Sequence, residues 1–292
     1  MADYHNVYKR QDVFRCVHDQ HGRFAHVVSP WHVLEAKRCW PEGCLSFDHR
    51  CSRLIKGRSC PRRFRRAGEK CQNCPSLREE KRLYVPEVVV APPAWEAFRM
   101  DLQRYRLWLS GIRGRGVTFF GKVEAVKPFL KHVIEERRSR FLFSGWWVQF
   151  AEGYINRDHF RDRLYLYLPK GKQNRWKVVA GDEVEGLAQA DVHEGRLILH
   201  QARSLELGRR GEGVPRRESD ILLGLNLGSL FRRQEERCFS CVQGVLVNVE
   251  NPAGLRNLPR RELFCLAGFR DPAVCTHAVF SRIALEGCRR AS

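Results

Sequence analysis

Alternating hydrophobic and polar positions mark the middle of the chain as a series of β-strands. Side chains that alternate with period two belong to strands with one buried face, and short apolar runs between turn residues behave similarly. Such segments occur at 117–124, 141–150, 163–168, 186–191 and 196–200. With no convincing helix among them, they predict a small five-stranded barrel.

The flanking segments follow other patterns. Residues 13–17 and 24–28 surround a Gly-containing turn and predict a hairpin. After Pro92-Pro93, apolar residues recur at steps of three and four up to about Ser110, which predicts a helix with one buried stripe. A Gly-rich stretch, 208–218, indicates a linker, and Ser219 is a candidate cap for a short helix reaching Phe231.

These patterns predict a chain that is mainly β with some α, divided into four parts. A basic, Cys-rich metal-binding module occupies 1–84, and a helical connector follows at 85–113. The barrel occupies 114–208. A linker, a short helix and a four-cysteine metal-binding module make up 209–292, where 245–249 and 262–264 are predicted strands.

The barrel segment resembles an OB-fold, a nucleic-acid-binding domain, over about a third of the chain. The sequence GKVEAV at 121–126 is similar to the G-x-V first strand of many such domains. GDEVEG at 181–186 is similar to the G-D-x-V-x-G turn before their fourth strand, and 195–205 fits the final strand. The resemblance concerns the fold of residues 114–207 and implies a five-stranded barrel. Function does not follow from fold alone.

Two tyrosines of the third predicted strand are candidates for stacking on nucleic-acid bases. If the alternating leucines from Leu164 to Leu168 face the core, Tyr165 and Tyr167 face outward. Exposed rings stack on unpaired bases, and nearby cations bind phosphates. The alternative for each ring is packing in the core. Because adjacent residues of a strand point to opposite faces, this alternative must apply to either Trp146 or Trp147. The predicted contacts are Tyr165, Tyr167, Trp146, Trp147, Lys122, Arg137, Arg138, Arg140, Lys170 and Lys172.

Twelve cysteines form two groups, separated by a cysteine-free stretch between Cys74 and Cys238. Each group contains a C-x-x-C step, whose tight turn aims two thiolates at one metal ion. The C-terminal site is predicted from Cys238, Cys241, Cys265 and Cys275, with Cys288 as a spare and His277 as a weaker candidate. Four thiolates complete tetrahedral zinc, so such a site is structural.

The N-terminal group leaves the ligand set open. The predicted ligands are Cys51, Cys60, Cys71 and Cys74; Cys39 and Cys44 are alternatives to any of them, and His49 is adjacent. Zinc at two sites is the first expectation. A [4Fe–4S] cluster at one or both ends competes, because Pro follows Cys60 and Cys74 as it follows the last cysteine of the bacterial ferredoxin motif, although the full spacing of that motif is absent. Eight cations and no acid lie between Arg50 and Arg66, which predicts a phosphate-binding patch that includes Arg62, Arg63, Arg65 and Arg66.

Net charge points to a polyanionic partner. The chain of 292 residues carries 52 Lys and Arg against 33 Asp and Glu, a net charge of +19. A basic folded chain favours nucleic acid, with anionic membranes or acidic proteins as alternatives. We see no signal peptide and no apolar run long enough to span a bilayer, so we predict a cytoplasmic, metal-binding chain rather than a disulfide-bonded one.

No familiar catalytic motif occurs, so the sequence argues against an enzyme without excluding a metal-assisted nuclease. The Asp-His pairs at 48–49 and 158–159 are better explained as surface residues. The leading hypothesis is a metal-stabilised protein that binds single-stranded or structured DNA or RNA. The alternatives are an iron–sulfur redox sensor or electron carrier, and a structural component of a larger nucleoprotein or protein complex.

Overall fold

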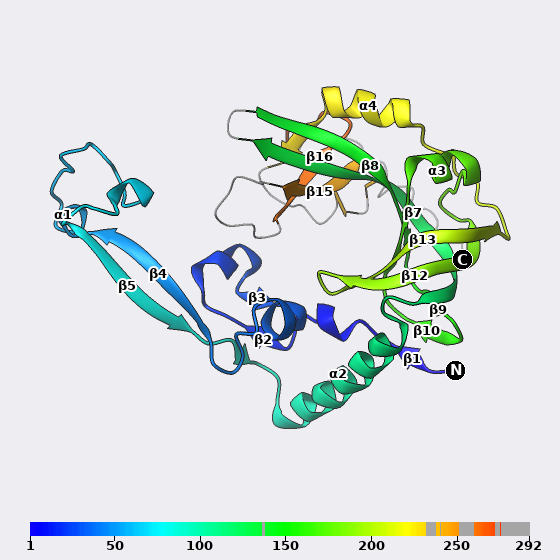
Figure 1. Cartoon of the computed structure of the whole chain (residues 1–292), viewed down its shortest axis with the longest axis horizontal. Helices are drawn as coiled ribbons and strands as arrows, with labels where there is room; N and C mark the ends of the chain where they lie inside the picture. Colours follow the sequence, from blue (N-terminus) through cyan, green and yellow to red (C-terminus); the bar gives the residue numbers. More distant parts are fainter. Residues whose placement is uncertain (136–137, 232–237, 240, 251–259, 272–274, 276–292) are drawn as a thin grey trace. The chain divides into compact units, whose positions relative to one another are not determined.

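The computed structural model describes residues 1–135, 138–231, 238–239, 241–250, 260–271 and 275 (Figure 1). The chain forms two compact units, which we describe separately. One combines Met1–His5 with Trp108–Ser292, and the other is Asn6–Leu107. The prediction of a mainly β chain is confirmed.

A closed ring of five strands lies at the centre of the first unit. Its strands are those expected from the sequence, although four of the five are longer than predicted. β7 pairs with β8, β8 with β11, β11 with β13, β13 with β12, and β12 with β7. The β11–β13 pair is parallel and the other four are antiparallel. The bounds are β7 Gly116–Glu135, β8 Arg138–Phe150, β11 Leu164–Leu168, β12 Glu183–His193 and β13 Arg196–Leu207.

Alternation along these strands fills the inside of the ring. Leu164, Leu166 and Leu168 of β11 are completely buried, together with Val148 and Phe150 of β8. Truncating one such side chain to alanine costs about 2–5 kcal/mol. Helix α3 (Lys170–Trp176) lies between β11 and β12 in the chain, and three short strands extend the sheet beside β7: β9 (Gly153–Ile155), β10 (Asp158–Phe160) and β1 (Asp3–Tyr4).

The turn before β12 is built around a buried carboxylate. Asp182 is completely buried and accepts hydrogen bonds from the backbone N–H groups of Val179 and Gly211, each at 2.8 Å. Its carboxylate also lies 3.2 Å from Nε of Arg210. Residues 209–211 therefore pack back on this turn, so the expectation of a free linker at 208–218 is wrong in its first part.

The distal half of β7 leaves the ring and joins a second group of strands (Figure 1). β15 (Gly244–Glu250) pairs in parallel with β7, and antiparallel with β16 (Arg260–Cys265). β14 (Ser229–Phe231) pairs with the other edge of β16. Helix α4 (Glu218–Leu227) precedes β14, and its N-cap is Arg217 rather than the expected Ser219. β15 and β16 contain the two C-terminal strands predicted from the sequence.

The second unit contains a small sheet and most of a long helix. β2 (Phe14–Arg15) pairs with β3 (Val27–Val28), as predicted, and also with β6 (Glu87–Val88). The predicted stripe of helix α2 (Pro92–Ile112) is confirmed, because Phe98, Leu102 and Tyr105 are buried. The unit also contains short turns of 3-10 or π-helix: η1 Val7–Lys9, η2 Asp19–Phe24, η3 Trp31–Ala36 and η4 Glu69–Cys71.

A long two-stranded hairpin also belongs to the second unit and was not predicted. β4 (Cys44–Cys51) pairs with β5 (Leu77–Tyr84) along its whole length, and helix α1 (Ser52–Ile55) follows β4 at the hairpin tip (Figure 1). Cross-strand ion pairs line it, including His49 with Glu79. Asp48 likewise faces Arg82, so this Asp-His pair lies in a salt-bridged surface, as expected.

Candidate nucleic-acid interface and cysteine sites

Four aromatic side chains gather on the outer face of the ring, and we call this set the aromatic face. It comprises Phe129 of β7, Trp147 of β8, and Tyr165 and Tyr167 of β11. Tyr167 lies opposite Trp147 in the strand register. Ring centroids are 5.6 Å apart for Trp147 and Tyr167, 6.3 Å for Trp147 and Tyr165, and 5.2 Å for Phe129 and Trp147. All four side chains are half-buried, so part of each ring is accessible.

Backbone geometry holds Tyr167 flat against its neighbouring strand. The Tyr167 hydroxyl donates a hydrogen bond to the carbonyl oxygen of Ser144 at 2.7 Å. Gly145 adopts φ +148°, and a Cβ there would lie 2.9 Å from the Tyr167 ring and 2.7 Å from the carbonyl oxygen of Leu168. Only glycine fits this close approach without displacement. The ring is thus fixed before any ligand arrives.

One predicted member of this surface belongs to the core instead. The side chain of Trp146 is 1% exposed and packs edge-on against Phe143. Successive strand residues point to opposite faces, so burying Trp146 turns Trp147 outward. Trp146 is therefore unavailable for stacking on a base, and the prediction that it contacts nucleic acid is wrong. Tyr154, a further aromatic residue of this unit, lies on β9 and stacks on His159.

Two cations, Lys131 and Arg163, border the aromatic face. The ammonium group of Lys131 is 5.9 Å from the centroid of the Phe129 ring. The Arg163 guanidinium is beside Tyr165 and forms two hydrogen bonds with the Glu124 carboxylate, at 2.9 and 3.0 Å. Phe129 was not among the predicted contacts, because Pro128 and the register shift between Phe129 and Leu130 interrupt the alternation of β7 there.

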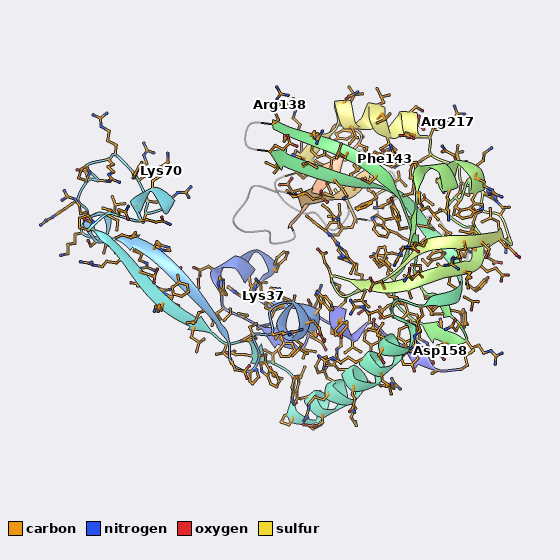
Figure 2. The ribbon with its side chains drawn as sticks, in the orientation of Figure 1. Lys37, Lys70, Arg138, Phe143, Asp158 and Arg217 are labelled. Atoms are coloured by element: carbon orange, nitrogen blue, oxygen red, sulfur yellow. The ribbon has the colours of Figure 1, made fainter. Side chains whose placement is uncertain are left out.

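The predicted cations of the ring are spread over three elements. Lys122 is exposed on β7, while Arg138 and Arg140 are exposed at the far end of β8, where Figure 2 labels Arg138. Lys170 and Lys172 belong to α3; the first forms an ion pair with Glu218 and the second donates to the carbonyl of Ala202. The remaining candidate, Arg137, lies outside the described residues.

The hairpin tip gathers the other predicted cations around an open hollow of about 600 Å³. Arg63, Arg65, Arg66 and Lys70 line it, and Figure 2 labels Lys70 there. Arg62 donates to the carbonyl oxygen of Lys70 at 3.2 Å, which ties the two sides of the loop together. We call this group the tip patch. Its exposed guanidinium groups are suited to contact phosphate oxygens.

The N-terminal cysteines separate into two groups at opposite ends of the hairpin. Cys51, at the tip end of β4, pairs with Leu77, and the Leu77 N–H donates to the carbonyl of Cys74. Cys44 pairs with Tyr84 at the other end. Cys44 and Cys51 are seven positions apart on β4, which corresponds to about 24 Å at 3.4 Å per residue. Cys44 therefore cannot replace a ligand at the tip, and that alternative is wrong.

Three of the predicted C-terminal ligands, Cys238, Cys241 and Cys265, lie around Gly244. This residue pairs with Cys265, and its N–H donates to the carbonyl of Cys241 at 3.1 Å. A Cβ on Gly244 would lie 3.3 Å from that of Cys238. The N–H of Gln243 donates to the Cys241 sulfur at 3.4 Å, as expected for a sulfur that gains negative charge. Cys275 is buried, while His277 and Cys288 lie outside the described residues.

The buried Lys127 of β7 binds the C-x-x-C turn between Cys238 and Cys241 through hydrogen bonds from its ammonium group. The Lys127 ammonium donates to the carbonyl oxygens of Phe239, Cys241 and Gly244, the last two at 3.1 and 3.0 Å. Burial lowers the pKa of Lys127 to about 8, and the nearby Cys241 thiol acts in the opposite direction. Although Lys127 lies on a strand of the ring, it is only 7% exposed, and its ammonium group is used internally.

Among the residues that the structure describes, no three Cys, His, Asp or Glu side chains already stand in metal-coordinating geometry. The described helices also include none with the length and hydrophobicity to cross a membrane. Compared with known protein families, with curated proteins and with solved structures, the chain shows no significant match.

Proposed function

We propose that the protein binds single-stranded or locally unpaired nucleic acid on the aromatic face. The observation that carries this proposal is the clustering of Phe129, Trp147, Tyr165 and Tyr167 on one accessible side of the ring. Unpaired bases present two apolar faces to such rings, and each base that stacks contributes about 1–3 kcal/mol. Rings held in place lose little entropy on binding.

The position of these rings within the sheet supports the same proposal. In OB-folds, oligonucleotides bind across the second and third strands of a five-stranded ring. Here β8 and β11 are the second and third strands of the ring in chain order, and they carry three of the four aromatic residues. The proposed OB-like barrel is thus consistent with the strand order and with the location of the rings.

Cations supply the second half of the proposed interaction. Lys131 and Arg163 border the aromatic face, and the tip patch offers four cations on the other unit. Neutralised phosphates release counterions, so affinity falls steeply as salt rises. We propose that the cysteine groups at the hairpin tip and around Gly244 bind structural zinc, with an iron–sulfur cluster as the competing occupant.

Fluorescence anisotropy with labelled single-stranded DNA and RNA tests the proposal. We expect Tyr165→Ala/Tyr167→Ala to weaken binding by at least about 30-fold, from about 1 kcal/mol per lost stack. Phe120→Ala is the matched control, because Phe120 is an exposed aromatic residue of β7 that belongs to a different part of the surface. Thermal unfolding checks that each variant folds. Equal affinity in the double variant and the wild type would remove the aromatic face from the binding site.

A further inference from the structure

Three cysteines that lack an assigned role meet at the end of the hairpin opposite the tip. Cys16 follows β2, Cys39 follows η3, and Cys44 begins β4. Cys16 and Cys39 are 2% and 4% exposed. The Cys39 thiol forms a hydrogen bond with the Cys44 sulfur, and the pKa of Cys39 rises to about 11 through burial, with further contributions from Cys44 and Cys16. Cys39 thus contacts Cys44, and Cys16 is close enough to both to act on them electrostatically.

A hydrogen-bonded pair of thiols with a third buried thiol nearby offers the donor atoms that one metal ion uses. Two thiolates bound to a tetrahedral zinc ion at 2.3 Å lie about 3.8 Å apart, which is close to a thiol–thiol hydrogen-bond distance. The backbone also brings Cys39 close to Cys44, because the Gly43 N–H donates to the carbonyl of Cys39. Both Cys39 and Cys44 therefore flank one tight turn.

Two histidines, His18 and His21, follow Cys16 closely in the chain. The ring of His18, two residues past Cys16, is 4.6 Å from the ring of Tyr84, and Tyr84 is the strand partner of Cys44. The ring of His21 is 5.6 Å from that of His18. Three thiols and a neighbouring imidazole match the Cys₃His donor set of structural zinc sites. His18 is the candidate fourth ligand because it lies two residues after Cys16 in the chain and its ring lies beside Tyr84, the strand partner of Cys44.

We propose that Cys16, Cys39, Cys44 and His18 form a third metal site, specific for zinc and separate from the sites at the tip and around Gly244. Binding releases the three thiol protons to solvent, while His18 binds as the neutral imidazole. Because these side chains do not yet stand in coordinating geometry, the ion must draw them together. The site would tie β2, the segment after η3 and the start of β4 to one another, next to a sheet, β3-β2-β6, whose strands have only two residues each.

Metal content of the intact chain, purified without oxygen, tests this site. We expect three zinc ions per chain in the wild type and two in Cys39→Ser. Cys74→Ser, the matched control at the tip, also loses one ion, and the double variant loses two. If Cys39→Ser retains the wild-type zinc content, the third site does not exist. Iron with inorganic sulfide that disappears in Cys39→Ser would replace zinc by a cluster and overturn the proposal.

Cobalt substitution keeps the test decisive if Cys39→Ser does not fold. His18→Cys preserves four ligands, so we expect unchanged metal content and a stronger sulfur-to-cobalt charge-transfer band. An unchanged cobalt spectrum in that variant would remove His18 from the site. Both readouts concern metal, so their outcome is independent of oligonucleotide binding by the aromatic face.

Discussion

Replacing Lys127 by methionine tests the C-terminal cysteine turn most directly. Methionine keeps most of the side-chain volume but removes the ammonium that three backbone carbonyls share. A hydrogen bond from a charged donor contributes about 1.5–3 kcal/mol, and burying the charge opposes part of that sum. We therefore expect Lys127→Met to lower the free energy of unfolding by about 3–5 kcal/mol, because three carbonyl oxygens lose their donor at about 1–3 kcal/mol each, less the cost of burying the ammonium that the variant no longer carries.

Urea denaturation measures this loss, and Lys122→Met is the matched control. Lys122 is exposed on the same strand, so its replacement should change stability by less than about 0.5 kcal/mol. Hydrogen exchange gives a local readout. Without the hydrogen bonds from the Lys127 ammonium, the Gly244 amide, which donates to the carbonyl of Cys241, should exchange faster. If Lys127→Met were as stable as the control and exchange of the Gly244 amide were unchanged, the hydrogen bonds from the Lys127 ammonium would contribute nothing to stability.

Three further predictions follow from described contacts. Asp182→Ala removes the acceptor of two buried backbone N–H groups and should cost about 3 kcal/mol or more in urea denaturation, whereas the exposed Glu185→Ala should cost under about 0.5 kcal/mol. Gly145→Ala should lower the melting temperature and weaken oligonucleotide binding, because its Cβ would displace Tyr167; Gly171→Ala, in open space, should do neither. Replacing the three arginines that line the tip patch by alanine should make the slope of log affinity against log salt shallower by about 2, because each phosphate contact on a single strand contributes about 0.7 to the slope. An unchanged slope would exclude the tip patch from the binding site.

The ring could be predicted from the sequence because its strands carry a clear period of two. The leucines of β11 occupy every second position and are all buried, so the opposite orientation of Tyr165 and Tyr167 followed directly. The extent of β7 was less evident. Pro128 interrupts the expected pattern, and the register shifts between Phe129 and Leu130, so the second half of the strand shows no regular alternation.

The hairpin of β4 and β5 escaped prediction for a different physical reason. Most side chains on both strands are exposed or half-buried, so neither strand shows an apolar face. Twenty-five residues also separate Cys51 from Leu77, which removes the short-turn signal of a hairpin. Without the hairpin, sequence spacing could not show that Cys44 and Cys51 lie at opposite ends. Cysteine proximity in the sequence was therefore misleading about shared sites.

The continuity of β7 determines where this chain can be divided. One strand supplies hydrogen bonds to the ring and, from Lys131 to Val133, to β15. A fragment that stops near residue 208 would leave that stretch of backbone as an open edge, next to the buried side chain of Leu130. Open edges of this kind recruit strands from other molecules and promote aggregation. Studies of the ring in isolation should therefore retain the C-terminal strands.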